Sequence, residues 1–218
     1  MKKYQIKYKD SFGEEQTEIA TDGSMLYFTL RGVEFEGIDF ESLEGEVDIG
    51  NFQYEMYQDG SGYLTNFELI VIIPIDIVRE GKEIIENLIA FVATGSGKSI
   101  VRLKLETEYG IVTGKKEYGY FEDAIIEIQK KLPKNTKIKT CLSCKYSNYH
   151  PVGNVMFGGL NCFKDVKEDL EKVYNKYDLM KIWDKGIENK DTFNVQETFV
   201  CEDHKFVTKH DWVYKNWT

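Results

Sequence analysis

The stretch FELIVIIPIDIV (67–78) contains the longest apolar run of the chain, and together with the two segments after it, it decides the fold. EIIENLIAFVAT (83–94) and SIVRLKLETEYG (99–110) follow, separated from it and from each other by the turn sequences REGK and GSGK. The apolar run is too short to cross a membrane and carries Asp76. A helix over 83–93 is the competing interpretation, but its β-branched content favours a strand. We therefore predict three antiparallel strands joined by hairpins.

Shorter segments with alternating apolar and polar residues precede this region. They are YQIKYKD (4–10), EQTEIAT (15–21), MLYFTLRG (25–32), VEFEGIDF (33–40) and FQYEMYQ (52–58). Regularly spaced strands with glycine-bearing turns and no helix between them are typical of antiparallel sandwiches and barrels. The sequence therefore predicts an antiparallel β-sandwich or barrel-like N-terminal domain over residues 1–118.

The pattern changes in the second part of the chain, residues 119–218. FEDAIIEIQKKLP (121–133) has helical spacing of its apolar residues, and a second helix is predicted over 165–183. TKIKT (136–140) and VQETFVC (195–201) are predicted as short strands. The fold class is therefore mainly β (α+β), with a smaller α+β region after the N-terminal domain.

The net charge of −9 is unevenly distributed along the chain. Residues 134–218 contain 14 lysines and 12 acidic residues, a balance of +2. The totals of 28 basic and 37 acidic residues therefore leave 14 and 25 for residues 1–133, a balance of −11. An acidic domain repels phosphate backbones, which argues against a nucleic-acid ligand and is compatible with a basic protein partner. Solvated surface remains the simpler interpretation of these acids.

The N-terminus lacks the apolar run of a signal peptide, so we expect a cytoplasmic protein without a membrane partner. In that reducing compartment, cysteines are metal ligands or free thiols more often than disulfides. The chain has four, with the spacing Cys141-x2-Cys144-x17-Cys162-x38-Cys201. Two thiolates separated by two residues can bind one ion, and a distant pair completes a tetrahedron. We therefore predict one structural zinc bound by Cys141, Cys144, Cys162 and Cys201.

Other interpretations of the cysteines remain open at this point. His204 or His150 could replace one thiolate, and the cysteines could instead be inert buried thiols or a redox pair. A closed set of four protein ligands leaves no position for water or substrate, which is the reason for predicting a structural site.

CLSCKYSNYHPVGNVMFGGLNCF (141–163), with VQETFVC (195–201), resembles an uncharacterised bacterial family of unknown function. The shared features are the CxxC, a Ser-x-Tyr-x-Pro-x-Gly loop, a Phe-Gly-x-Leu-x-Cys-Phe turn and a late Gln-Glu-Thr segment before the last cysteine. The resemblance groups the same four cysteines in one site and implies no activity. Proteins of this kind are neighbours of bacterial toxin systems, so the resemblance implies an immunity or antitoxin-type role.

No catalytic motif is recognised in the sequence, so we expect a non-enzymatic protein-binding protein. One alternative is a hydrolase with an active site in a sheet cleft that the sequence does not reveal. A second alternative is a zinc-containing regulator that binds nucleic acid, which the charge disfavours.

Overall fold

The computed structural model describes residues 1–46, 51–95, 97–189 and 193–217. It confirms the prediction of a mainly β, antiparallel fold. One nine-stranded sheet has the order β10-β9-β8-β7-β1-β2-β3-β4, and β11 pairs with β7 beside this path. Its strands are β1 (Lys2–Asp10), β2 (Gly13–Thr21), β3 (Leu26–Leu30), β4 (Val33–Gly37), β7 (Glu68–Arg79), β8 (Lys82–Ala93), β9 (Ile100–Thr107), β10 (Gly110–Thr113) and β11 (Thr136–Lys139).

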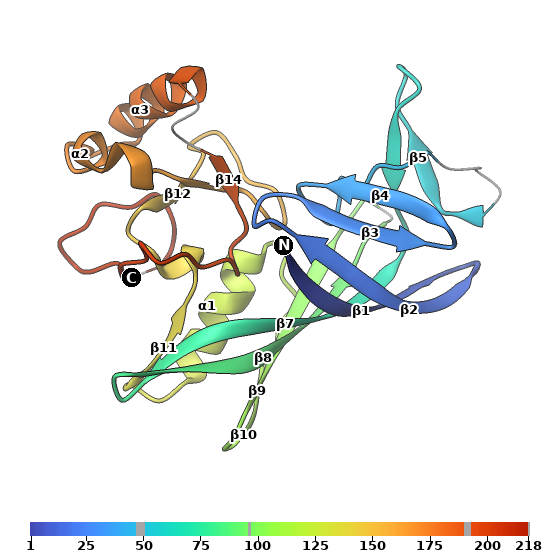
Figure 1. Cartoon of the computed structure of the whole chain (residues 1–218), viewed down its shortest axis with the longest axis horizontal. Helices are drawn as coiled ribbons and strands as arrows, with labels where there is room; N and C mark the ends of the chain where they lie inside the picture. Colours follow the sequence, from blue (N-terminus) through green and yellow to red (C-terminus); the bar gives the residue numbers. More distant parts are fainter. Residues whose placement is uncertain (47–50, 96, 190–192, 218) are drawn as a thin grey trace.

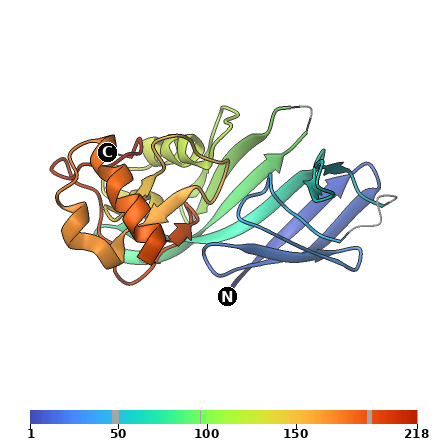
Figure 2. The same cartoon turned by 90° about the horizontal axis from the view of Figure 1, so that it is seen from above.

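Two small sheets and a few helices complete the described structure. The small strands are β5 (Tyr54–Met56), β6 (Gly62–Leu64), β12 (Ser147–Tyr149), β13 (Leu160–Cys162) and β14 (Phe193–Val195). The helices are α1 (Phe121–Lys131), α2 (Lys167–Leu170) and α3 (Lys176–Asn189), with 3-10 turns η2 (Cys141–Ser143) and η3 (Lys164–Val166). Strands β1–β4 lie at one end of the molecule and the C-terminal residues at the other, with β7, β8 and β9 running between them (Figures 1 and 2).

Strand β7 is the centre of the large sheet. One of its edges pairs with β8 from Glu68 to Arg79. Its other edge is shared, because β1 pairs with residues 68–72 and β11 pairs with residues 76–79. Pro74 lies in the interval between these two partners. A proline has no backbone N–H to donate, so it is tolerated where a strand lacks a partner on one side.

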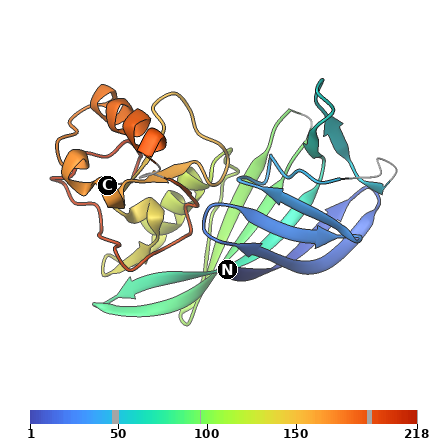
Figure 3. The same ribbon diagram turned by 45° about the horizontal axis from the view of Figure 1, so that its top comes forward.

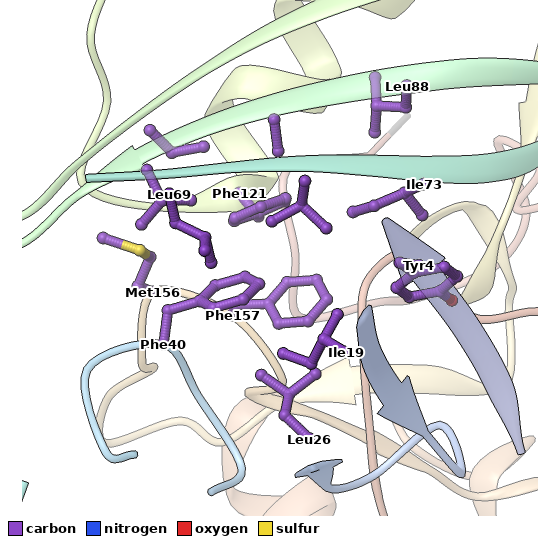
Figure 4. Packing of buried hydrophobic residues seen from close by; sticks show 14 of the residues in the cluster. Tyr4, Ile19, Leu26, Phe40, Leu69, Ile73, Leu88, Phe121, Met156 and Phe157 are labelled. Carbon is purple, nitrogen blue, oxygen red and sulfur yellow. The ribbon is translucent and has the colours of Figure 1, made fainter. Parts of the chain in front are cut away.

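The main hydrophobic core is built from both parts of the chain. Phe40 follows β4, Phe121 begins α1, and Phe157 lies in the loop before β13. Their rings pack together, with centroids 5.0 Å apart for Phe40 and Phe157 and 4.5 Å apart for Phe121 and Phe157 (Figure 4). This aromatic cluster joins the sheet, the first long helix and the cysteine-rich loop.

A smaller second core lies beneath α2 and α3. It contains Cys144, Tyr146, Phe163, Leu170, Val173, Leu179 and Trp183. Helices α2 and α3 lie on the same side of the molecule as β12 and β14 in Figure 1. Cys144 therefore belongs to this second core, whereas Cys141 and Cys162 belong to the main one.

Several individual predictions are confirmed. Residues 83–93 form a strand rather than a helix, as part of β8. Residues 121–131 form the helix α1, which buries Phe121, Ala124, Ile125 and Ile128. The predicted strand over 136–140 is β11.

Two predictions were wrong. The helix expected over 165–183 is broken after Leu170 and begins again at Lys176. Asn175 causes the restart, because its side-chain oxygen accepts hydrogen bonds from the backbone N–H groups of Tyr177 and Asp178. The strand expected over 195–201 ends at Val195, because Gln196 and Glu197 direct their side chains into buried hydrogen bonds instead.

In the described ranges, no helix is long and apolar enough to cross a membrane. The division into domains at residues 118 and 119 stays a prediction. Two elements from beyond that division nevertheless contact the large sheet. Strand β11 belongs to it and pairs with β7, and helix α1 packs against β9 and β10.

Candidate metal centre

Cys141 and Cys144 lie in a tight turn directly after β11. Cys141 begins η2, and the backbone N–H of Cys144 donates to the Cys141 carbonyl at 3.1 Å. Ser143 closes the same turn, because its hydroxyl accepts the Thr140 N–H at 3.0 Å and donates to the Thr140 carbonyl at 2.9 Å. The CxxC is therefore held in a 3-10 turn, and both cysteines are buried.

Cys162 is brought to this turn by the hairpin of β12 and β13, in which it pairs with Ser147. The hydroxyl of Ser147 donates to the Cys141 carbonyl. Gly158 permits the loop before β13, because its φ is +79° and a Cβ there would lie 2.3 Å from the Ile38 carbonyl oxygen. This conformation lets the chain turn back toward the CxxC.

Cys201 reaches the same place from the C-terminal segment. The N–H of Cys141 donates to the Phe199 carbonyl, and Cys144 forms an isolated antiparallel bridge with Phe206. Segment 199–206 therefore runs alongside the CxxC turn (Figure 3). Cys201 is partly exposed, whereas the other three cysteines are buried.

All four thiols are free and interact electrostatically with one another. Burial raises the pKa of Cys141 well above its usual value, and the thiols of Cys144, Cys162 and Cys201 raise it further. Burial likewise raises the pKa of Cys162 to about 11. The structure thus brings the four predicted residues into one region. As the side chains lie, the described residues include no group of three or more His, Cys, Asp or Glu that could hold a metal ion.

A lysine lies beside the CxxC turn. The Lys215 ammonium donates to the carbonyls of Cys141 and Cys144, and to the Ser147 hydroxyl at 2.8 Å. Burial lowers the pKa of Lys215 to about 8, while the nearby thiols of Cys144 and Cys141 act in the opposite direction. Ionised thiols at this place would therefore stabilise the lysine as an ammonium, and the lysine would offset part of their charge.

The two histidines considered as replacement ligands have other partners. The Nε2 atom of His204 lies 3.0 Å from the Ser143 hydroxyl, and burial lowers the pKa of this imidazole to about 4. His150 lies edge-on to Trp183, and its Nδ1 accepts the N–H of Val152 at 3.2 Å.

Sequence reasoning missed two buried carboxyl groups beside this region. Glu197 is fully buried and accepts three hydrogen bonds, from the Tyr149 hydroxyl at 3.1 Å and from the N–H groups of Gly158 and Gly159 at 2.6 and 3.3 Å. Asp39 accepts the Met156 N–H at 3.0 Å, and its other oxygen has no hydrogen-bond partner within the described ranges. Both carboxyls therefore bind the loop that leads to Cys162.

These carboxyls favour their protonated forms. Burial raises the pKa of Asp39 to about 8, with Glu41 and Glu197 adding to the shift. Burial also raises the pKa of Glu197 to about 7, although its hydrogen bonds act in the opposite direction. No sequence signal distinguishes these two acids from the many exposed ones, because burial is a property of the fold.

Comparison with known proteins also relates the chain to a family of unknown function. Residues 2–147 match the model of DUF6304, described as a family of unknown function. The chain belongs to this family. The match covers about two thirds of the chain and lies mainly over the large sheet, whereas the resemblance was drawn from residues 141–163 and 195–201. Of the four cysteines it includes Cys141 and Cys144. No curated protein and no solved structure matches the chain.

The chemistry of the donor set fits zinc. Four sulfur ligands without disulfides are the soft set that tetrahedral zinc sites use. Burial disfavours the thiolate form at Cys141 and Cys162, and a bound cation reverses that preference. The donor set therefore suits zinc, whereas the side chains as they lie are not arranged as a closed tetrahedron.

Proposed function

We propose that this member of the DUF6304 family is a non-enzymatic protein-binding protein whose C-terminal third is stabilised by one structural zinc bound to Cys141, Cys144, Cys162 and Cys201. The observation that carries the zinc proposal is the convergence of four free thiols from three separate segments. A group of thiols with no shared ligand gains little from such proximity, because the thiols of Cys144, Cys162 and Cys201 raise the pKa of Cys141.

The zinc has a structural role in this proposal. Four thiolates fill the tetrahedron, so no position is left for water or substrate. The ion would connect the turn after β11, the end of β13 and the segment containing Cys201, and would add to the hydrogen bonds that already join the turn to that segment. In zinc-finger peptides, such binding contributes roughly 10–16 kcal/mol at neutral pH.

The protein-binding role is supported by charge. Residues 1–133 carry a balance of 14 basic and 25 acidic residues, which suits a basic partner and repels nucleic acid. An immunity or antitoxin-type role is the form of this proposal that the family resemblance favours, because inhibition of a basic toxin requires an acidic surface and no chemistry. The proposal places the protein in the reducing cytoplasm, where the thiols stay available to metal.

Metal analysis tests the zinc proposal directly. The full chain, purified under reducing conditions from zinc-supplemented medium, should contain about one zinc per chain, as expected for one tetrahedral site. Chelation should lower the melting temperature and increase hydrogen exchange over residues 141–201 more than over β1–β4. Cys162→Ser should lose the metal and show the same exchange pattern without chelator.

Asn161→Ser is the matched control for this experiment. Asn161 precedes Cys162 in β13 and is also buried. Its side chain donates a hydrogen bond to Asn194 and is not one of the four proposed zinc ligands. This variant should retain zinc. A fully reduced wild-type protein without bound metal, or a Cys162→Ser variant with full zinc content, would contradict the proposal.

The binding role is tested separately. Capture with the native, zinc-loaded protein followed by mass spectrometry should recover a basic protein whose retention falls as salt is raised. Expression of the chain should also protect a host from that partner if the partner is a toxin. Catalytic turnover of a defined substrate by the purified chain would contradict the non-enzymatic role.

A further inference from the structure

A large hollow in the described structure lies over the outward face of β1–β4. It has a volume of about 1560 Å³. Its floor is formed by outward residues of these four strands, and its wall by residues 44–46 and the β5–β6 hairpin. This hairpin projects beyond β4 in Figures 1 and 3. We call this hollow the trough.

The trough is strongly acidic, and its charges are unbalanced. Its lining contains the glutamates Glu18, Glu34, Glu36, Glu44 and Glu46, and a single lysine, Lys3. Lys3 already pairs with Glu18 at 3.1 Å. Within the described part of the chain, the other four glutamates form no ion pair with a lysine, arginine or histidine. Four carboxylates are therefore left for a cation from outside.

Acidic residues elsewhere on the same sheet form ion pairs with basic side chains. Glu14 pairs with Lys7 at 2.8 Å, and Glu86 pairs with Arg79 at 3.1 Å. Acidic residues opposite basic ones are the ordinary arrangement on a solvated sheet face, because opposite charges across strands contribute about 0.2–1 kcal/mol. The unbalanced acids of the trough are thus a local feature rather than the general state of this surface.

Two of these glutamates are fixed side by side. Glu36 and Glu44 form an antiparallel bridge, and their backbone N–H groups donate to each other's carbonyls at 2.9 and 2.8 Å. Like charges directly opposite each other destabilise a sheet. A cation bound between them would remove this repulsion. The bridge also occupies the edge of β4, so a ligand here must be recognised by side chains rather than by adding a strand at this position.

Apolar side chains on the same face indicate a polypeptide rather than a small cation. Lys7 and Gln5 of β1 pair with Ile70 and Ile72 of β7, which places these isoleucines on the outward face beside the trough. They are 38% and 39% exposed, and Met56 in the wall is 48% exposed. Interfaces combine such apolar contact with charged groups at the rim.

We propose that the trough binds an extended, lysine- and arginine-rich segment of a protein partner, with the apolar residues of that segment covering Ile70, Ile72 and Met56. The inference rests on the proposed protein-binding role and names where the partner binds. Arg and Lys side chains of the segment pair with Glu34, Glu36, Glu44 and Glu46, which supplies orientation and a fast, salt-dependent association.

A labelled synthetic peptide tests this surface. A fluorescein-labelled ten-residue peptide in which arginine and leucine alternate should bind the full-length, zinc-loaded chain in fluorescence anisotropy at low salt, with weaker binding as salt is raised. The double variant Glu36→Gln and Glu44→Gln should weaken binding about tenfold, because two charge-assisted contacts are lost. Spermine and calcium should compete poorly, since neither covers the apolar residues.

The matched control removes the same charge elsewhere. The double variant Glu168→Gln, Glu171→Gln changes one exposed glutamate in α2 and another directly after it, far from the trough in sequence. It should leave peptide affinity within about twofold of wild type. Equal weakening by both double variants would show that only net charge matters and would overturn the proposal. Absence of peptide binding, or equal displacement by spermine or calcium, would also overturn it.

The two proposals can fail independently. If a basic partner is captured by the wild-type chain and by the Glu36→Gln, Glu44→Gln variant equally well, the protein-binding role stands and the trough is not the site. If the wild-type chain captures no partner but binds the peptide through the trough, the surface stands and the cellular role does not.

Discussion

Asp39 is buried, and the nearby carboxyl of Glu197 adds to the rise in pKa that burial causes at Asp39. In the unfolded chain Asp39 has its usual pKa near 4, whereas burial raises the pKa to about 8 in the folded protein. The folded state therefore binds a proton more tightly than the unfolded state between these two values. The free energy of unfolding therefore falls as the pH rises through this interval. Above it, Asp39 causes no further change with pH.

Asp39→Asn should remove this pH-dependent loss. The asparagine carbonyl can still accept the Met156 N–H, and its amide replaces the oxygen that has no hydrogen-bond partner in the described structure. The variant should be more stable than wild type at pH 8.5 by about 1 kcal/mol or more, and the difference should be smaller at pH 5. Urea denaturation at both pH values measures it. A difference that does not grow with pH would contradict the assignment.

Glu197→Gln is the comparison variant, and its effect should have the opposite sign. Glu197 accepts hydrogen bonds on both oxygens, from Tyr149, Gly158 and Gly159. A glutamine would place an amide N–H₂ against one of these donors, so we expect a loss of about 1–3 kcal/mol. The same urea experiment at pH 5 separates the two buried carboxyls.

At the scale of single residues, the sequence indicated the cysteines and missed the carboxyls. Cysteines are rare and have few roles in a reducing compartment, so their spacing is informative. Asp39 and Glu197 are two acids among 37 in the chain. Nothing in their neighbours in sequence shows that segments more than 100 residues apart enclose them.

The break between α2 and α3 shows how one capping residue defines an element. Apolar spacing continues through Val166, Leu170, Val173, Tyr174 and Tyr177, which is why one helix was predicted. In the structure Leu170 and Val173 are buried, whereas Tyr174 and Tyr177 are 75% and 66% exposed. Asn175 changes the chain direction between them and begins the second helix.

Asn175→Ala should destabilise α3 by about 1 kcal/mol, because two backbone N–H groups lose their acceptor. Hydrogen exchange over residues 176–189 should increase, with little change in the large sheet. Glu171→Ala, an exposed change in the same connecting segment, is the control and should leave exchange in α3 unaltered. Equal exchange in both variants would show that packing of Leu179 and Trp183, rather than the cap, sets the helix start.

Among the elements, the strands of the large sheet were the most predictable. Their period of two follows from one buried and one exposed face, and each turn contains glycine or another turn residue. The segment 196–201 was not predictable in this way. Its Thr, Phe and Val residues are typical of a strand, but its polar side chains are buried by hydrogen bonds to residues distant in sequence, such as Thr21 and Gly158.

The core of the whole molecule crosses the predicted domain division. Phe40 packs against Phe121 and Phe157, and β11 covers the last third of one edge of β7. A fragment of residues 1–118 would lack α1, β11 and the aromatic partners of Phe40. It would also expose an unpaired, apolar strand edge, which promotes aggregation.

The isolated fragment 1–118 should therefore fail to fold as a cooperative monomer. Size-exclusion chromatography should show aggregates, and circular dichroism should show no sharp thermal transition. Co-expression with residues 119–218 as a separate chain is the control, because it restores the missing elements and should yield a soluble complex. A monomeric 1–118 fragment with a cooperative transition would show that the sheet folds alone.

The sequence by itself determined the antiparallel strands, the first long helix and the grouping of cysteines as candidate ligands, because these depend on local periodicity and on residue chemistry. Tertiary structure alone decided that β1 and β11 share one edge of β7, that Asp39 and Glu197 are buried together, and that Glu36 and Glu44 lie side by side in the trough. The physical reason is that pairing, burial and charge repulsion depend on distances between segments far apart in the chain, and local sequence does not encode those distances.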